Sequence, residues 1–479
     1  MLVFSRYFVL LLVILGAAAT SASNPLETPS RLRSTPCRGA PLEAKCFWAT
    51  VPEDRADPDS RTIDLWVVIV PARSGASAEP VLFFPGGPGQ ATKALMGSSL
   101  RSYREALARR DAVYIGQRGT DYPNPLHCRS LSTEATRFFG RLFDAREIGR
   151  CYRETVQHSD PNLYGTPQYV EDLADVLDLL NYRRVVLWGG SGGTRTALAF
   201  LRAQPDRVVA AALLGVSPLD FAMPLPFAGF VDRAWQRVVD ECGAQSSCRE
   251  AYPNLDASLD MVRRRLEEQS VPVEFQDLAG SSVTAEMSLA DFAYALRGML
   301  YGSRTIARLP GLVTRAARTG DLSTFALLHF SRSRSLFGGA VALGVHLSVY
   351  CSEDVPWIEP ALVDGAVRGT LLGRYLVDEY SAACGEWPVE PVAAAWREPV
   401  ASDVPVLLVS GYFDPSTPDL AAESVMKRLS NSRHVVVRSA GHDAGFGCLA
   451  PSVDRFLAEG SHENLDTECA LEPRRFLTP

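Results

Sequence analysis

The sequence predicts an α/β fold in which a mostly parallel central sheet is covered by helices on both faces and interrupted late by a large helical insertion. Short apolar runs typical of buried strands alternate with helical segments up to about residue 220. From about 221 to 400 the chain is helical and aromatic, and strand-like runs resume at 401. Because the two strand blocks fit one sheet, we expect 221–400 to be a lid rather than an independent helical domain.

The N-terminal residues predict a cleaved signal peptide over 1–22. Arg6 supplies a positive charge, Tyr7–Leu15 is apolar, and small residues follow up to Ser23. The apolar run is short for a bilayer span and no basic flank follows it, so we favour cleavage near Ala22 over an uncleaved anchor. No later segment is long and apolar enough to span a membrane. We therefore expect a secreted or periplasmic protein with no membrane attachment after cleavage.

The ten cysteines agree with export, because all of them follow the predicted signal peptide and their number is even. None forms a C-x-x-C pair, which argues against zinc and thioredoxin-like chemistry, and cysteines of exported proteins mostly form disulfides. Sequence cannot fix the connectivity, but the spacing favours neighbours pairing in order. The expected pairs are Cys37–Cys46, Cys128–Cys151, Cys242–Cys248, Cys351–Cys384 and Cys448–Cys469.

The charge of the chain argues against nucleic-acid and anionic-membrane partners. The formal net charge is −7, and removing the predicted signal with its single Arg6 gives −7 − 1 = −8. No basic runs are present, so a mildly acidic surface is expected. Neither G-x-x-x-x-G-K-[ST] nor G-x-G-x-x-G with a downstream acid occurs, which makes nucleotide binding a poor prediction. We expect no metal and no cofactor.

The expected elements follow in chain order and divide the chain into a first core part (37–220), the lid (221–400) and a C-terminal core part (401–479). Apolar and polar residues alternate along Cys46–Val51 and Thr62–Pro71, which predicts an antiparallel strand pair. The remaining expected elements are the strands Pro80–Phe84, Ala112–Ile115, Val208–Val216, Val404–Ser410 and His434–Val437, and the helices Lys93–Arg109 and Gln168–Leu180.

The most informative stretch is Gly189–Gly193, a G-x-S-x-G motif. The apolar run Arg184–Trp188 before it predicts a buried strand, and Thr194–Leu201 after it predicts a helix. Strand, G-x-S-x-G turn and helix together make the nucleophile elbow of an α/β-hydrolase, with Ser191 as the nucleophile. The alternative is a small-residue turn in another doubly wound protein, which would need no acid and no histidine at the ends of later strands.

A serine nucleophile needs a base, and the base needs an orienting carboxylate. In α/β-hydrolases both follow the serine on loops after the last strands, in the order acid then histidine. Asp414 follows the strand Val404–Ser410, and His442 follows the next strand. Asp443 is a rival carboxylate, but a residue adjacent to His442 cannot easily reach its Nδ1. We therefore predict a Ser191, Asp414, His442 triad.

The loop Pro85–Gly89 lies where this fold places an oxyanion donor. Residues without side chains let a backbone N–H approach the developing alkoxide. We predict that Gly86 or Gly87 acts with the N–H of Gly192, the residue after the nucleophile.

As a set, these motifs resemble the proline iminopeptidase and tripeptidyl aminopeptidase family of serine exopeptidases, and its exported, cysteine-containing branch most closely. The resemblance runs from about residue 37 to the C-terminus. It implies a lidded α/β-hydrolase that releases one to three residues from free peptide N-termini. The chain departs from the family at Pro85, where a histidine is frequent, and at Gly116 and Asp121 around Gln117-Arg118-Gly119.

An exopeptidase must bind a protonated N-terminal amine, and a partly desolvated ammonium needs a carboxylate nearby. Glu353 and Asp354 are the expected amine-binding residues, since related exported enzymes carry a similar Cys-x-acid element. The alternative for these two acids is a solvated turn. A carboxylesterase using the same triad is the competing enzyme, and a non-catalytic binding protein would require loss of a triad residue. The expected partner is a peptide or small ester substrate, and the oligomeric state stays open.

Overall fold

The computed structural model describes residues 31–479 except 76–77, 129–130, 132–133, 278 and 338–339. The predicted signal peptide, 1–22, lies outside the described residues. No helix of the described part has the length and apolar character needed to cross a membrane.

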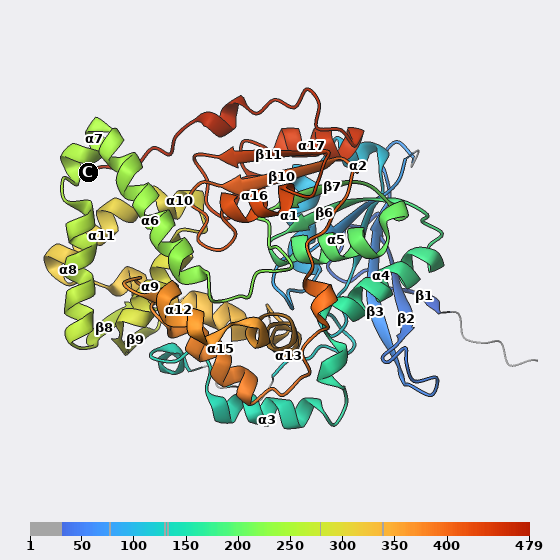
Figure 1. Ribbon diagram of the computed structural model, residues 1–479, viewed down its shortest axis with the longest axis horizontal. Helices are drawn as coiled ribbons and strands as arrows, with labels where there is room; N and C mark the ends of the chain where they lie inside the picture. Colours follow the sequence, from blue (N-terminus) through green and yellow to red (C-terminus); the bar gives the residue numbers. More distant parts are fainter. Residues whose placement is uncertain (1–30, 76–77, 129–130, 132–133, 278, 338–339) are drawn as a thin grey trace, which may run out of the picture. The chain divides into compact units, whose positions relative to one another are not determined.

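The core of the fold is a nine-stranded sheet in the order β1-β2-β3-β5-β4-β6-β7-β10-β11. The first three strands pair antiparallel, as do β3 and β5, and every later neighbouring pair is parallel (Figure 1). The strands are β1 (Leu32–Thr35), β2 (Lys45–Pro52), β3 (Thr62–Val70), β4 (Val81–Phe84), β5 (Ala112–Ile115), β6 (Val185–Gly190), β7 (Val208–Leu214), β10 (Val406–Gly411) and β11 (Ser432–Val437). The α/β fold with its mostly parallel sheet is thus as predicted, and β1 is an addition that the sequence did not signal.

Buried clusters lie on both faces of this sheet, because successive strand residues point to opposite faces. On β4, Phe83 joins one cluster, whereas Leu82 and Phe84 join the other. The helices packed on the Phe83 face are α1 (Lys93–Ser102), α2 (Ala106–Arg109) and α17 (Ala450–Glu459), and those on the other face are α4 (Thr166–Leu179), α5 (Gly192–Ala203) and α16 (Asp419–Met426). The single helix expected over Lys93–Arg109 is two helices, because the chain leaves helical geometry at Tyr103.

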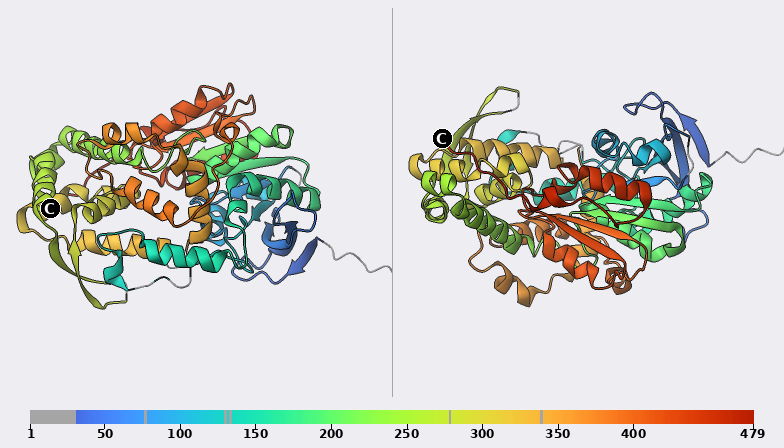
Figure 2. Two further views of the ribbon diagram at one scale, coloured as in Figure 1. Left: turned by 60° about the horizontal axis from the view of Figure 1, so that its bottom comes forward. Right: turned by 90° about the horizontal axis from the view of Figure 1, so that it is seen from above.

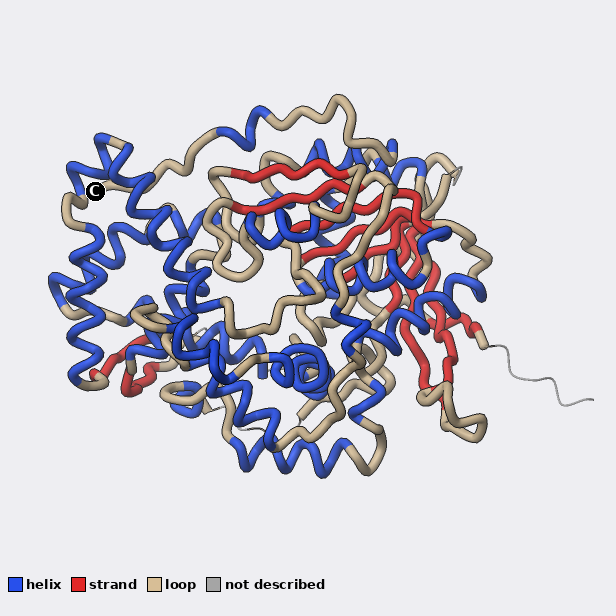
Figure 3. The backbone as a smooth tube through the Cα atoms, viewed as in Figure 1, coloured by secondary structure: helices blue, strands red, loops and turns tan. Residues whose placement is uncertain are grey.

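Between β7 and β10 the chain leaves the sheet and returns to it, so that β10 pairs directly with β7 (Figure 2). The intervening residues form helices and one antiparallel hairpin (Figure 3). They are α6 (Phe227–Ala244), α7 (Ser246–Ala251), α8 (Leu255–Glu268), β8 (Val271–Gln276), β9 (Ser282–Met287), α9 (Leu289–Met299), α10 (Ser303–Ile306), α11 (Leu309–Thr319), α12 (Ser323–Phe337), α13 (Leu343–Val349), α14 (Pro360–Val367) and α15 (Tyr375–Gly385). We refer to this segment as the insertion.

The insertion has its own buried cluster, and part of the chain before α4 belongs to it. Phe138, Leu142 and Ile148 pack there with insertion residues such as Phe292 and Phe325. Ile148 lies on α3 (Ala145–Thr155), which runs beside α15 and α13 in Figure 1. The excursion between β5 and α4 therefore supports the insertion as well as the sheet.

The ten cysteines are paired as neighbours in chain order, and none is free. Cα–Cα separations of the five pairs run from 5.1 to 6.1 Å, within the usual range for disulfides. The pairs are Cys37–Cys46, Cys128–Cys151, Cys242–Cys248, Cys351–Cys384 and Cys448–Cys469. The last bridge lies shortly after His442.

Candidate active site

Ser191 occupies the sharp turn between β6 and α5, with φ 53° and ψ −126°. A non-glycine residue at positive φ is strained, and such strain persists only where the surroundings enforce it. Its N–H donates to the carbonyl of Leu214 on β7 (2.8 Å), and its carbonyl accepts from the hydroxyl of Thr194 (2.6 Å). These bonds present the Ser191 hydroxyl at the carboxyl end of the sheet.

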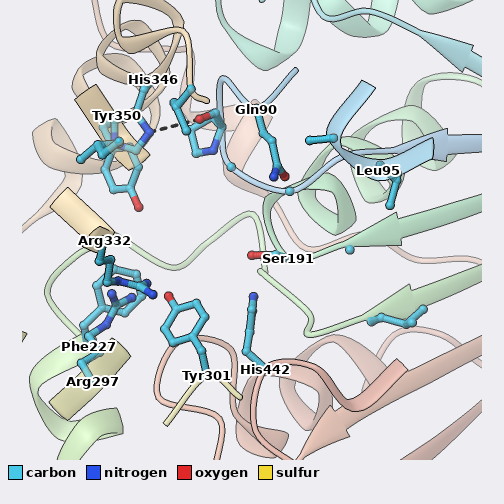
Figure 4. A pocket seen from close by; sticks show the side chains of 18 of the residues that line it. Gln90, Leu95, Ser191, Phe227, Arg297, Tyr301, Arg332, His346, Tyr350 and His442 are labelled. Atoms are coloured by element: carbon cyan, nitrogen blue, oxygen red, sulfur yellow. Dashed lines mark hydrogen bonds between the residues drawn. The ribbon is translucent and has the colours of Figure 1, made fainter. Parts of the chain in front are cut away.

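His442 and Asp414 come from the loops after β11 and β10 and meet at hydrogen-bond distance. His442 Nδ1 donates to Asp414 Oδ2 across 2.7 Å. The other edge of the imidazole faces Ser191, as Figure 4 shows, and both residues border one cavity. The rival Asp443 turns away from the imidazole and accepts from the N–H and hydroxyl of Ser303 (2.9 and 2.7 Å). The three predicted triad residues are brought together.

The Asp414 carboxylate is buried and accepts hydrogen bonds from residues of its own turn. Its Oδ1 accepts from the N–H groups of Ser416 (2.8 Å) and Thr417 (3.0 Å), and its Oδ2 accepts from the Thr417 hydroxyl (2.9 Å). Thr417 Oγ1 also lies 3.1 Å from His442 Nδ1. Sequence reasoning missed Thr417, although a hydroxyl residue shortly after an aspartate in a turn is a known signal for such bonding.

The ionisation of the pair suits a histidine base. Burial alone would raise the pKa of Asp414, but the charge and hydrogen bond of His442 hold it below its ordinary value. Burial alone would lower the pKa of His442, but Asp414 outweighs it and raises that pKa above 6.5. Asp414 therefore stays a carboxylate and stabilises the imidazolium that forms when His442 accepts a proton.

The glycine loop lies directly against the elbow. A Cβ on Gly192 would stand 2.4 Å from the carbonyl oxygen of Gly87, so only glycine permits this approach. Gly87 itself has φ 116°, a conformation that favours glycine. Gly86, Gly87 and Ser191 border the same cavity, which is where backbone N–H groups of an oxyanion hole are needed.

The insertion holds this loop from the other side. His346 on α13 donates from Nδ1 to the Pro88 carbonyl (3.1 Å) and accepts at Nε2 from the Tyr380 hydroxyl (2.8 Å). Burial lowers the pKa of His346 to about 4, so the ring stays neutral. The N–H of Ala342 adds a bond to the Gly89 carbonyl (2.8 Å). His346 was not predicted, and no motif marks it.

Two cavities meet at Ser191. The larger has a volume of about 480 Å³ and is bordered by the sheet loops and by insertion residues that include Arg297, Tyr301 and Arg332 (Figure 4). The smaller, about 100 Å³, extends past Gly192 toward Arg195 and Asp354. No Asp or Glu borders the larger cavity among the residues that the structure describes.

The structure corrects the amine-binding prediction for Glu353. Its carboxylate borders neither cavity and instead accepts from the N–H (2.6 Å) and hydroxyl (2.9 Å) of Thr166 at the start of α4. A carboxylate is stabilised at a helix N-terminus, which explains this placement. Asp354 does border the smaller cavity, but Arg195 donates to both of its oxygens (2.8 and 2.9 Å).

No group of histidine, cysteine, aspartate or glutamate side chains in the described part of the chain could hold a metal ion.

Comparison with known proteins agrees with this site. The α/β-hydrolase family described as "TAP-like protein" matches residues 370–469, which include Asp414 and His442. Serine protease Hip1 of Mycobacterium tuberculosis is 24% identical over 508 residues, covering 95% of this chain and 94% of that protein, and Hip1 of Mycobacterium bovis matches equally. The protein is a serine hydrolase of the α/β-hydrolase fold.

Among solved structures, proline iminopeptidase from Mycobacterium smegmatis is 14% identical, with a TM-score of 0.38 and coverage of 86% of this chain and 98% of that one. A serine hydrolase from Cycloclasticus zankles is 11% identical, with the same TM-score and coverage of 86% and 97%. These likenesses are weak, and the fold is established by the strand order. Over residues 370–469 the chain is similar to the TAP-like family of α/β-hydrolases.

Proposed function

We propose that this protein is a serine peptidase that acts through an acyl-enzyme on Ser191. Ser191 Oγ attacks the substrate carbonyl carbon while His442 Nε2 takes its proton. The N–H groups of Gly192 and of the Gly86–Gly87 loop stabilise the oxyanion. His442 then gives the proton to the leaving group as its bond to the carbonyl carbon breaks. A water molecule attacks the acyl carbon while His442 takes its proton, and His442 returns that proton to Ser191 Oγ as the acyl–Oγ bond breaks. The contact between His442 and Asp414 beside Ser191 carries this proposal.

Labelling with a fluorophosphonate tests the nucleophile. Ser191→Ala should abolish covalent labelling, because the probe needs the activated hydroxyl. Ser424→Ala is the matched control, since Ser424 lies on α16 and only donates to the Ala421 carbonyl (2.8 Å). Labelling of the Ser191→Ala protein at the wild-type rate would overturn the assignment.

The finer proposal is that the enzyme releases one to three residues from the N-terminus of a peptide. Among the described residues, Asp354 is the one carboxylate that borders either cavity at Ser191, and it supports this proposal as an acceptor for the amine. Because Arg195 already pairs with it, the ammonium would join an existing ion pair. Arg297 borders both cavities and Arg332 only the larger one, so the smaller cavity is the one in which a carboxylate offsets the cations.

Chromogenic peptides with a free N-terminal amine and their N-acetylated counterparts test the exopeptidase proposal. Wild type should cleave the free peptides at least about tenfold better, the effect of one charged hydrogen bond. Asp354→Asn should raise KM for the free peptides, and Asp364→Asn is the matched control because Asp364 pairs with Arg374 on the surface. Equal cleavage of acetylated peptides would remove the exopeptidase proposal.

A carboxylesterase is the second candidate, and one observation favours it. The cavity that is large enough for an acyl chain has no Asp or Glu on its described walls and so offers no partner for an amine. Rapid hydrolysis of short acyl esters without cleavage of any peptide of the panel would select this alternative.

Export and the lid role of the insertion are also proposed. Five disulfides support an oxidising compartment. Mass spectrometry of the N-terminus of protein recovered outside the cytoplasm should find cleavage near Ala22, and an intact N-terminus would contradict it. The insertion supports the lid proposal because it supplies walls of both cavities at Ser191.

A further inference from the structure

The larger cavity carries two positive charges close to the nucleophile. Arg297 extends from α9 and Arg332 from α12, and both border the cavity together with Ser191 and His442. Figure 4 shows the two arginines on the side of the cavity where the ring of Tyr301 lies. The charged side chains on the described walls of this cavity are therefore cationic.

Both guanidinium groups are held by rings and a hydroxyl rather than by carboxylates. Arg332 lies 3.9 Å and Arg297 5.2 Å from the centre of the Tyr301 ring. Arg297 also lies 4.3 Å from the Phe227 ring and donates from Nη2 to the hydroxyl of Ser416 (2.5 Å). Cation–π contacts place a guanidinium firmly but leave its charge uncompensated.

The buried residues Arg118 and Arg195 differ in this respect. Arg118 forms a two-pronged pair with Asp172 (2.7 Å for each bond), and Arg195 does the same with Asp354. No described Asp or Glu forms an ion pair with Arg297, which is 5% exposed, or with Arg332. A buried charge is costly unless it is paired. Arg297 and Arg332 thus have no carboxylate partner among the described residues, and both border the cavity that Ser191 also borders.

The pKa of Tyr301 is lowered by the positive charge around it. Burial would raise the pKa of its phenol, but Arg297, Arg332 and His442 lower it to about 7. The Tyr301 ring also lies 4.7 Å from the His442 ring. An anion drawn to the two arginines would consequently lie within reach of the reacting groups.

We propose that Arg297 and Arg332 form an anion subsite that binds a carboxylate of the substrate beside Ser191. The planar fork of a guanidinium matches a carboxylate, and two forks can hold its two oxygens. The carboxylate belongs either to an acidic acyl group or to the free C-terminus of a short leaving group. This inference rests on the proposed hydrolysis at Ser191 and names the substrate class of that site.

Matched esters test the acyl source. The pair is 4-nitrophenyl hemiglutarate, which has a free carboxylate, and its methyl ester, which has none. If the acyl group carries the anion, wild type should show a kcat/KM at least about tenfold higher for the charged ester. Arg332→Gln should bring this ratio close to one. The control Arg334→Gln should keep it, because Arg334 is exposed on the same helix and contacts the Phe330 ring.

Product inhibition tests the leaving-group source. Leucine, with its carboxylate, and leucinamide, without one, are compared as inhibitors of hydrolysis of the neutral ester. If the leaving group carries the anion, leucine should inhibit about tenfold more strongly, and Arg332→Gln should abolish the difference. Arg332→Lys should restore part of either preference, because it returns the charge without the fork.

The proposal is overturned if wild type prefers the charged member of neither pair, or if Arg332→Gln leaves an observed preference intact. Both readouts use ester hydrolysis, so they stand even if peptides are not cleaved. Failure of the peptidase proposal and failure of the anion subsite are therefore separate results.

Discussion

The sheet and the insertion contribute different chemistry to the same cavity. Ser191, Asp414 and His442 all lie at or shortly after carboxyl ends of sheet strands. Backbone bonds hold Ser191 and Asp414, and the side chain of His442 is held by its bond to Asp414. Arg297 and Arg332 lie on helices of the insertion and are placed by ring contacts. The sheet thus supplies groups that move protons and form bonds, while the insertion supplies groups that select a substrate by charge.

The difference teaches where change is tolerated. A strand-end residue acts only if the sheet register holds it to within a fraction of an ångström, so its replacement removes catalysis. An arginine on a helix changes which substrate fits and leaves the bond-forming groups in place. We expect substitutions on the sheet side to reduce kcat/KM for all substrates by a similar factor. We expect substitutions on the insertion side to change the ratio of kcat/KM values between charged and neutral substrates.

The largest effect should come from Asp414→Asn. The amide cannot stabilise the imidazolium or hold His442 in the required tautomer, so kcat should fall by about 10⁴-fold on every substrate. Steady-state kinetics with a neutral 4-nitrophenyl ester measures this. Asp443→Asn is the matched control, because Asp443 bonds Ser303 rather than the imidazole, and it should retain most activity. An inactive Asp443→Asn with an active Asp414→Asn would reverse the assignment.

The second-largest loss of activity should come from Gly192→Ala, which disturbs the contact between the Pro85–Gly89 loop and the turn at Ser191. In Gly192→Ala the new Cβ would meet the Gly87 carbonyl at 2.4 Å, so the loop must move and the oxyanion donors with it. We expect kcat to fall by about 10²–10³-fold, the effect of losing one oxyanion donor. Gly229→Ala in α6, where no atom lies within 4 Å of the added Cβ, should be fully active. Comparable loss in both proteins would mean that folding, and not the oxyanion hole, was disturbed.

Much of the sheet and the placement of its candidate catalytic residues could be predicted from sequence because both depend on local signals. A strand, a G-x-S-x-G turn and a helix specify Ser191 within a dozen residues, and strand ends locate Asp414 and His442. The helix break at Tyr103 and the edge strand β1 carried no comparable signal.

The insertion could not be predicted in the same way. Arg297 and Arg332 are distant in sequence and meet only through the packing of α9 against α12. The sequence predicts Glu353 as an amine ligand because it lies in the expected lid and in a Cys-x-acid element similar to that of related exported enzymes. The carboxylate instead meets Thr166 on α4, a contact that no periodicity reveals. Charge selection depends on tertiary contacts of this kind.

The pH dependence of kcat/KM tests the division between sheet and insertion, because His442 from the sheet and Tyr301 from the insertion border the same cavity. His442 must be neutral to accept a proton, and Asp414 raises its pKa above 6.5. kcat/KM for a neutral ester should therefore fall tenfold per pH unit below that pKa, with a midpoint above 6.5. Tyr301, with a pKa of about 7, can add a second step. Tyr301→Phe should retain the His442 step, and loss of the low-pH limb in that variant would assign it to the phenol instead.

The smallest effect should come from His346, where the insertion acts on the catalytic loop without touching the substrate carbonyl. Its Nδ1–H fixes the Pro88 carbonyl and so positions Gly86 and Gly87. His346→Phe removes that donor, and one hydrogen bond of about 1 kcal/mol corresponds to a roughly fivefold fall in kcat with KM nearly unchanged. His346→Asn returns an N–H close to the place of Nδ1 and should restore part of the rate. If His346→Phe instead raises KM alone, the residue belongs to substrate selection like the arginines, and the insertion has no part in positioning the catalytic loop.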